Sequence, residues 1–171
     1  VFVVDSMTAT IGERLLLLYG IELVNEGLDA ATVAAKLDAV KDRVCIYARL
    51  DTLEYLRKGG RISGATAVVG SMLNIKPLIG VQDGVVANVG KARGPKAADK
   101  LLRELIAKSG GIDFSKPLCA AYSGNEDDNL KTFLTDSTDT LCGTEAPIAT
   151  VGCVIGAHVG PGAVAMAYFK N

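Results

Sequence analysis

The single histidine of the chain, His158, lies in a segment of glycine and proline between two apolar runs. The segment reads Gly156-Ala157-His158-Val159-Gly160-Pro161-Gly162. An imidazole can donate a hydrogen bond to a carboxylate or act as a general base, so a tight backbone around it is typical of a ligand-binding loop. A loop histidine that packs on the next element would give the same pattern. With no second histidine and no close pair of cysteines, a metal site is not expected here.

A cation follows two glycines in the segment Lys58-Gly59-Gly60-Arg61-Ile62-Ser63. The glycines predict the end of a helix and leave the backbone bare beside the arginine. The planar guanidinium of Arg61 can donate two parallel hydrogen bonds to a carboxylate or a phosphate. The segment therefore has two interpretations: an anion-binding site, or a helix end with a solvated arginine.

Two further segments have charges or glycines at spacings that occur in binding sites. Lys91, Arg93 and Lys96 form a small basic group, which is either a solvated face or a docking surface for an acidic protein or a lipid head group. The run from Gly84 to Lys91 is similar to a nucleotide-binding loop. However, five residues separate its glycines, and Ala92 stands where serine or threonine is required. We therefore expect no nucleotide site.

The charge balance excludes one large class of partner. The 171 residues include 18 lysines and arginines against 19 aspartates and glutamates, which gives a formal net charge of −1. Proteins that bind nucleic acid through its phosphates are strongly basic, so nucleic acid is not an expected partner. The four cysteines form no CxxC pair, which favours free thiols in a reducing cytoplasm.

Residues 146–169 contain no charged side chain and are numerous enough to cross a bilayer. Glycine and proline in the middle of this stretch break a helix. We therefore predict two buried strands, at 148–155 and 163–169, joined by the histidine segment. No transmembrane segment is predicted.

The rest of the chain alternates strands and helices, which is typical of an α/β fold. Asp83-Gly84 between two apolar runs predicts a hairpin, so the sheet is expected to be mixed. A domain boundary is predicted near residue 50, because the elements before it are too few to close a sheet alone. The other predicted strands are 1–4, 44–47, 76–81, 85–89 and 118–122. Three helices are predicted to be capped by Thr10, Asp29 and Asp51, and a fourth has Pro95 in its first turn. Two more helices are predicted at about 65–73 and 125–134.

Two long segments resemble the signatures of the DegV family. The run Asp51-Thr52-Leu53-Glu54-Tyr55-Leu56-Arg57-Lys58-Gly59-Gly60-Arg61-Ile62-Ser63, followed by Gly70-Ser71-Met72-Leu73-Asn74-Ile75-Lys76-Pro77-Leu78-Ile79, is similar to the central signature. The histidine segment with Ala163 is similar to the C-terminal signature. Asp83-Gly84 and Lys91-Ala92-Arg93 fall at the expected places between them, so the resemblance covers essentially the whole chain.

The resemblance implies a bacterial, cytoplasmic protein with the two-domain DegV-like α/β fold, in which helices flank a mixed sheet. It implies a long-chain fatty acid bound in a cleft between the two domains. In bacteria that have fatty acid kinase, DegV proteins are its lipid-binding subunits. They present the carboxylate to the catalytic subunit for acyl-phosphate formation and are not enzymes themselves. No cofactor and no metal is implied, and a transient contact with a membrane surface is compatible with this role.

The resemblance also implies roles for particular residues. Arg61 and His158 match family positions near the lipid head group, and we expect Gly60, Ser63 and Gly160 to complete that ligand-binding site.

Lys91 and Arg93 match the basic region implicated in kinase docking. Residues 1–50 are expected to be the closing part of a truncated N-terminal domain, and 51–171 to be the C-terminal α/β domain.

Two other functions stay open on the sequence alone. The first is an enzyme that acts on a small carboxylate or phosphate ester, with His158 as general base and Ser63 or Ser71 as nucleophile. No G-x-S-x-G motif supports that enzyme. The second is an interaction domain that has lost its lipid pocket.

Overall fold

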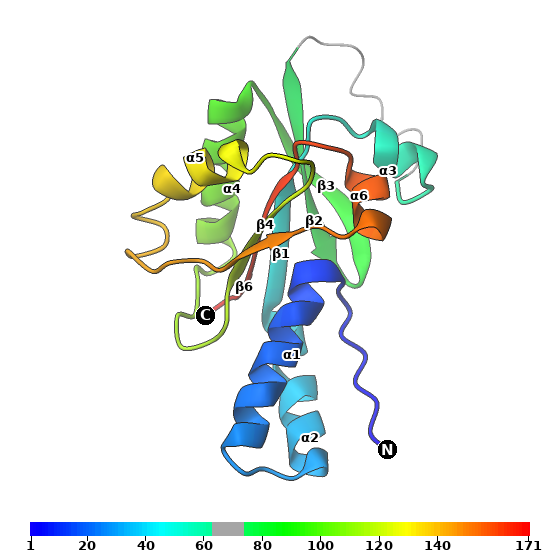
Figure 1. The fold of residues 1–171 in the computed structure, drawn as a ribbon, viewed down its shortest axis with the longest axis vertical. Coiled ribbons are helices and arrows are strands. Elements are labelled where there is room, and N and C mark those ends of the chain that lie inside the picture. Colours follow the sequence, from blue (N-terminus) through cyan, green and yellow to red (C-terminus); the bar gives the residue numbers. More distant parts are fainter. Residues whose placement is uncertain (63–73) are drawn as a thin grey trace.

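Strand β1 (Val44–Arg49) lies at the centre of a mixed sheet and pairs with β2 (Ile75–Gln82) and β6 (Val164–Phe169). The computed structural model describes residues 1–62 and 74–171. The described residues form a six-stranded sheet in the order β3-β2-β1-β6-β4-β5. Its remaining strands are β3 (Val85–Arg93), β4 (Cys119–Tyr122) and β5 (Ile148–Thr150), of which β5 runs parallel to β4. The predicted α/β class with a mixed sheet is confirmed (Figure 1).

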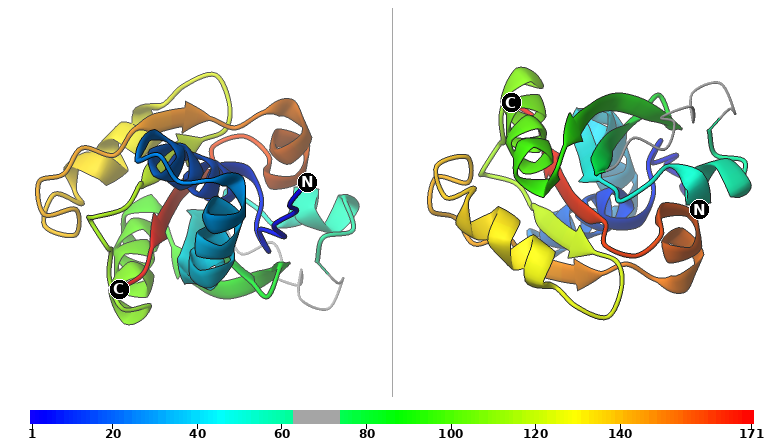
Figure 2. Two further views of the ribbon diagram at one scale, coloured as in Figure 1. Left: turned by 90° about the horizontal axis from the view of Figure 1, so that it is seen from below. Right: turned by 90° about the horizontal axis from the view of Figure 1, so that it is seen from above.

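Helices cover both faces of this sheet. The helices α1 (Thr10–Asn25), α3 (Glu54–Lys58) and α6 (Cys153–Val159) pack on one face. The helices α4 (Pro95–Lys108) and α5 (Asp128–Thr135) pack on the other. Figure 2 shows α3 beside α6 at one side of the molecule and α4 beside α5 at the opposite side. The short helix α2 (Ala30–Val40) packs on α1, and a 3₁₀ turn (Lys41–Arg43) leads from it into β1.

Local sequence signals explain several element boundaries. The β2–β3 hairpin turns at Asp83 and Gly84, whose φ angles of 50° and 75° are those of a two-residue turn that favours glycine. The side chain of Asp29 accepts a hydrogen bond of 2.8 Å from the backbone N–H of Thr32 and so caps α2. Pro95 occupies the first turn of α4, where its missing N–H is not needed. These three predictions are confirmed.

The caps predicted for α1 and α3 are wrong in detail. The α1 helix begins at Thr10, but no side chain caps it. At α3 the hydroxyl of Thr52 accepts the backbone N–H of Glu54 at 3.1 Å. The predicted cap, Asp51, instead forms an ion pair of 2.7 Å with Lys76. The N-cap position itself is Leu53, whose side chain cannot cap the helix.

Two predicted strands are also wrong. Residues 1–4 form no strand with any other described segment, and Val1, Phe2 and Val3 are exposed. Of the predicted strand 148–155 only Ile148–Thr150 pairs with β4, and α6 follows after Gly152. Short apolar runs fit a strand or a buried helix equally well, so their period alone does not decide between the two. The predicted helix at 65–73 lies outside the described residues.

The domain boundary predicted near residue 50 falls directly after β1. Because β1 hydrogen-bonds to both β2 and β6, strands from both sides of that position build one sheet. The division of the whole protein into two domains stays a prediction. Among the described residues, no helix has the length and apolar character needed to cross a membrane.

Candidate functional site

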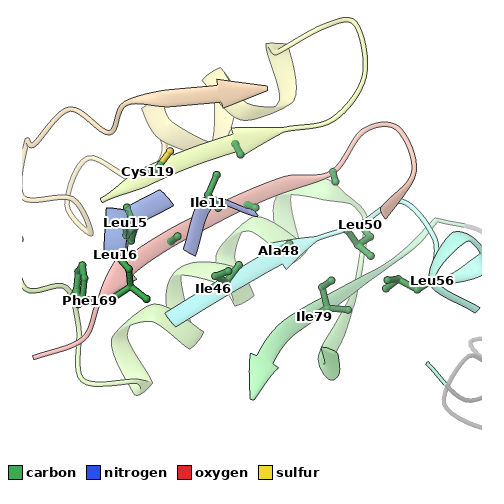
Figure 3. Packing of buried hydrophobic residues seen from close by; sticks show 14 of the residues in the cluster. Ile11, Leu15, Leu16, Ile46, Ala48, Leu50, Leu56, Ile79, Cys119 and Phe169 are labelled. Carbon is green, nitrogen blue, oxygen red and sulfur yellow. The ribbon is translucent and has the colours of Figure 1, made fainter. Parts of the chain in front are cut away.

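A cavity of about 300 Å³ lies between the sheet and the helices α1, α3 and α6. Its walls are almost entirely apolar. Figure 3 shows Ile11, Ile46, Ala48 and Ile79 on this side of the sheet. The lining residues are Ala9, Thr10, Ile11, Ile46, Ala48, Leu56, Arg61, Ile79, Val81, Val86, Ala121, Val151, Val154, Ile155, His158, Val159, Ala163 and Ala165.

Small side chains on the sheet make room for this cavity. Successive side chains of a strand point to opposite faces, so β6 and the residue before it place Ala163, Ala165 and Ala167 on the cavity face. Their neighbours Val164, Met166 and Tyr168 fill the other face. An alanine leaves space that a larger residue would occupy, and the helices do not fill that space completely.

Arg61 lies at the mouth of the cavity. It lines the cavity and is exposed, and its guanidinium Nη1 donates to the Gly59 carbonyl at 2.8 Å. The end of α3 explains this position, because Gly60 has a φ of +69° that turns the chain out of the helix. Lys58 is engaged elsewhere through an ion pair of 2.8 Å with Glu54, and its hydrogen bond lowers the pKa of that carboxyl.

His158 comes to the same cavity from the last turn of α6. Its imidazole packs so closely on Gly59 that a Cβ at that position would overlap the ring. Among the described residues, Nδ1 of His158 is buried and has no hydrogen-bond partner. Nδ1 is also the ring atom nearest to Gly59, so this nitrogen faces α3, while the ring as a whole lines the cavity.

Gly160 follows the last residue of α6 and lies against Tyr55 of α3. Its φ of +73° favours glycine, and a Cβ there would overlap the ring of Tyr55. The predicted residues Gly60, Arg61, His158 and Gly160 are thus brought together where α3 and α6 meet. Their roles in binding stay predictions.

Of the other predicted residues, Lys91 and Arg93 do not lie in this group. Ser63 is outside the described residues, as is Ser71. Lys91 and Arg93 are exposed on β3, at an edge of the sheet, and neither lines the cavity. In the part of the chain that the structure describes, no cluster of three or more His, Cys, Asp or Glu side chains is arranged to hold a metal.

Sequence reasoning missed the alanine wall and one polar residue, Ser123. The wall had a signal in the alternation of alanine with larger residues from Ala163 to Tyr168. Ser123 had none, because a serine after a short strand is unremarkable by composition.

An apolar cavity with a guanidinium and an imidazole at one end suits an amphiphile that has an anionic head and an apolar tail.

Comparison with known proteins identifies the family of this chain. A family model described as "Uncharacterised protein, DegV family" matches residues 1–171. The chain belongs to the DegV family.

DegV relatives in curated collections share moderate identity with the chain. A DegV domain-containing protein of Deinococcus radiodurans is 35% identical over 98% of this chain and 59% of its own length. A DegV domain-containing protein of Clostridium perfringens is 30% identical over 99% of this chain and 58% of its own length. The chain thus spans somewhat less than three-fifths of the length of these DegV relatives.

Solved DegV structures share the fold. A DegV family protein of Eubacterium eligens loaded with heptadecanoic acid has a TM-score of 0.88 at 18% identity, and covers 98% of this chain and 60% of its own. The Fatty Acid Kinase (Fak) B3 protein of Streptococcus pneumoniae, loaded with linoleic acid, has a TM-score of 0.87 at 21% identity, with 98% and 59% covered. A Thermus thermophilus DegV protein described as binding fatty acid has a TM-score of 0.80 at 30% identity, with 97% and 60% covered.

Proposed function

We propose that the protein binds a long-chain fatty acid, with the acyl chain in the apolar cavity and the carboxylate at Arg61 and His158. The observation that carries this proposal is the joining of an apolar cavity to a guanidinium and an imidazole from two adjacent helix ends. The fatty acids bound to the Eubacterium eligens and Streptococcus pneumoniae DegV proteins support it.

The acyl chain and the carboxylate would contribute differently to the free energy of binding. Each buried methylene stabilises binding by about 0.8 kcal/mol, so the acyl chain supplies most of the affinity. The polar end sets the orientation. A volume of about 300 Å³ is at the lower end of the range for ligand pockets. We therefore propose that the rest of the whole protein forms a second wall, which makes the site a cleft between two domains.

The whole protein would then present the carboxylate to a fatty acid kinase catalytic subunit, where the acyl phosphate is formed. The likeness to the kinase protein of Streptococcus pneumoniae supports this step at the level of fold. Lys91 and Arg93 would provide the docking surface, because both are exposed on an edge strand. This work would take place in the cytoplasm, with transient contact at a membrane surface for loading. Catalysis would belong to the kinase.

Lipid analysis tests the binding proposal. Organic extraction of the full-length protein, followed by mass spectrometry, is expected to release a long-chain fatty acid. His158→Ala should weaken binding by about 1.5–3 kcal/mol, tenfold or more, because a hydrogen bond to a charged group is lost. The exposed Lys131→Ala is the matched control and should bind normally. A lipid-free wild type with no affinity for fatty acids would contradict the proposal.

A kinase assay tests the docking surface separately. Lys91→Ala together with Arg93→Ala should retain fatty-acid binding but reduce acyl-phosphate formation.

Turnover of small esters that disappears in His158→Ala would instead favour the hydrolytic alternative. A lipid-free protein that still binds the kinase would indicate an interaction domain.

A further inference from the structure

Ser123 lies directly after β4 and is buried, with 4% of its surface exposed. Its hydroxyl donates to the carbonyl of Gly160 and accepts the backbone N–H of Ala163 at 3.1 Å. The two partners are at opposite ends of the turn that joins α6 to β6. One side chain therefore spans the whole turn.

The backbone of Ser123 holds the same turn. Its N–H donates to the carbonyl of Ala163 at 3.2 Å, and its carbonyl accepts the N–H of Gly162 at 2.8 Å. At the entry to α6 the N–H of Val151 donates to the carbonyl of Tyr122 at 2.9 Å. The end of β4 thus anchors the chain before and after α6.

This anchoring reaches His158 through a short path. The N–H of Gly160 donates to the carbonyl of Gly156 at 2.9 Å, so the anchored residue also closes the last turn of α6. That turn carries His158, whose imidazole packs on Gly59. A movement of Gly160 away from Ser123 would therefore move the imidazole relative to Arg61 and the cavity.

We infer that Ser123 is a positioning residue that sets the place of the His158 imidazole at the head-group end of the cavity. The inference rests on the proposed function, since it assigns Ser123 a part in fatty-acid binding. A hydroxyl suits the position because it donates one hydrogen bond and accepts others at once. An alanine would leave a buried carbonyl and a buried N–H without their side-chain partner.

The test compares two serines in the full-length protein. Ser137 is a matched control because it is 1% exposed and its hydroxyl donates to the Phe133 carbonyl, within the α4–α5 side of the molecule. Ser123→Ala should weaken palmitate binding about three- to tenfold, because a displaced imidazole makes a poorer hydrogen bond to the carboxylate. Ser137→Ala should lower the unfolding temperature about as much as Ser123→Ala does, but it should leave the palmitate affinity unchanged.

The second readout is the NMR signal of the His158 ring Cε1–H, assigned as the signal absent from His158→Gln. Without ligand, this signal should move and broaden in Ser123→Ala and stay in place in Ser137→Ala. If Ser123→Ala does not fold, Ser123→Cys keeps the volume with a much weaker donor and serves the same comparison.

The two proposals fail in different ways. A wild type that binds no palmitate would refute the proposed function, while the ligand-free NMR comparison would still test the positioning role. An unmoved His158 signal in Ser123→Ala, with palmitate affinity equal to that of Ser137→Ala, would overturn the inference.

Discussion

The same strands form both faces of the sheet, but the two faces differ in how closely they are packed. On the face covered by α4 and α5, large side chains such as Met166, Tyr168 and Phe133 are fully buried. On the face covered by α1, α3 and α6, alanines border a cavity of about 300 Å³. Because side chains alternate along a strand, one segment can contribute to a closed core on one face and to a cavity wall on the other.

The closed face also contains a buried ion pair. Arg49 and Asp99 are 1% and 4% exposed, with Nε of the arginine 3.2 Å from Oδ1 of the aspartate. Burial raises the pKa of the Asp99 carboxyl, while Arg49 and Arg103 act against that rise. The cavity face has its charged group, Arg61, at the solvent edge instead. The closed face therefore buries its ion pair, whereas the charge of Arg61 at the cavity is accessible to solvent.

The largest effect is expected from breaking that ion pair. Arg49→Met should cost about 3–5 kcal/mol of unfolding free energy at pH 7, because the Asp99 carboxylate stays buried without its partner. Loss of Arg49 raises the pKa of Asp99 further. A raised pKa gives stability that is present at about pH 4 and below and is lost as the pH rises through the folded-state value. Urea unfolding should show the deficit shrinking between pH 7 and pH 4.

The surface pair of Lys131 and the half-buried Asp127 is the control for the buried pair. Lys131→Met should leave the free energy of unfolding at pH 7 almost unchanged, because solvent screens this pair. A similar small cost for Arg49→Met would remove the electrostatic contrast between the faces.

A smaller difference is expected between adjacent residues of β2. Leu78 is fully buried on the closed face, and Ile79 is 7% exposed and lines the cavity. Leu78→Ala should cost about 2–5 kcal/mol, toward the upper end, because it leaves a new void. Ile79→Ala should lie toward the lower end, because part of that side chain already borders empty space. Equal costs in denaturant unfolding would argue that both faces are equally packed.

The smallest stability effect comes from adding volume to each face. Ala120 lies in the closed core and Ala121 lines the cavity, one residue apart on β4. Ala120→Leu should cost about 1–3 kcal/mol through overpacking. Ala121→Leu should be nearly neutral, because the new side chain enters the cavity. Thermal unfolding of the two variants measures the difference, and an equal loss would mean that the cavity face has no room.

Local signals predicted the elements whose chemistry is strong and short-range. Asp83-Gly84 specified the hairpin, Asp29 the α2 cap and Pro95 the start of α4. The apolar run from 148 was ambiguous because its length and composition suit both a strand and a helix, and tertiary contacts decided where β5 ends and α6 begins. Residues 1–4 had strand composition, but they pair with no strand among residues 1–62 and 74–171.

Part of the candidate site could also be predicted, because two of its residues stand in short-range sequence signals. Arg61 and His158 stand in glycine-rich segments that are visible in the sequence, and both line one cavity. The close packing of Gly59 on the imidazole and the two bonds of Ser123 join residues far apart in the chain. Such contacts follow from the order of strands in the sheet, which short-range patterns do not encode.

Titration of the full-length protein with palmitate, after removal of any bound lipid, tests the central claim most directly in the pair Ala121→Leu and Ala120→Leu. A leucine in the cavity should displace at least two acyl methylenes, about 1.6 kcal/mol or roughly tenfold in affinity. We predict that Ala121→Leu loses this affinity and that Ala120→Leu, below its unfolding temperature, binds like the wild type. Wild-type affinity in Ala121→Leu would contradict the placement of the acyl chain in this cavity.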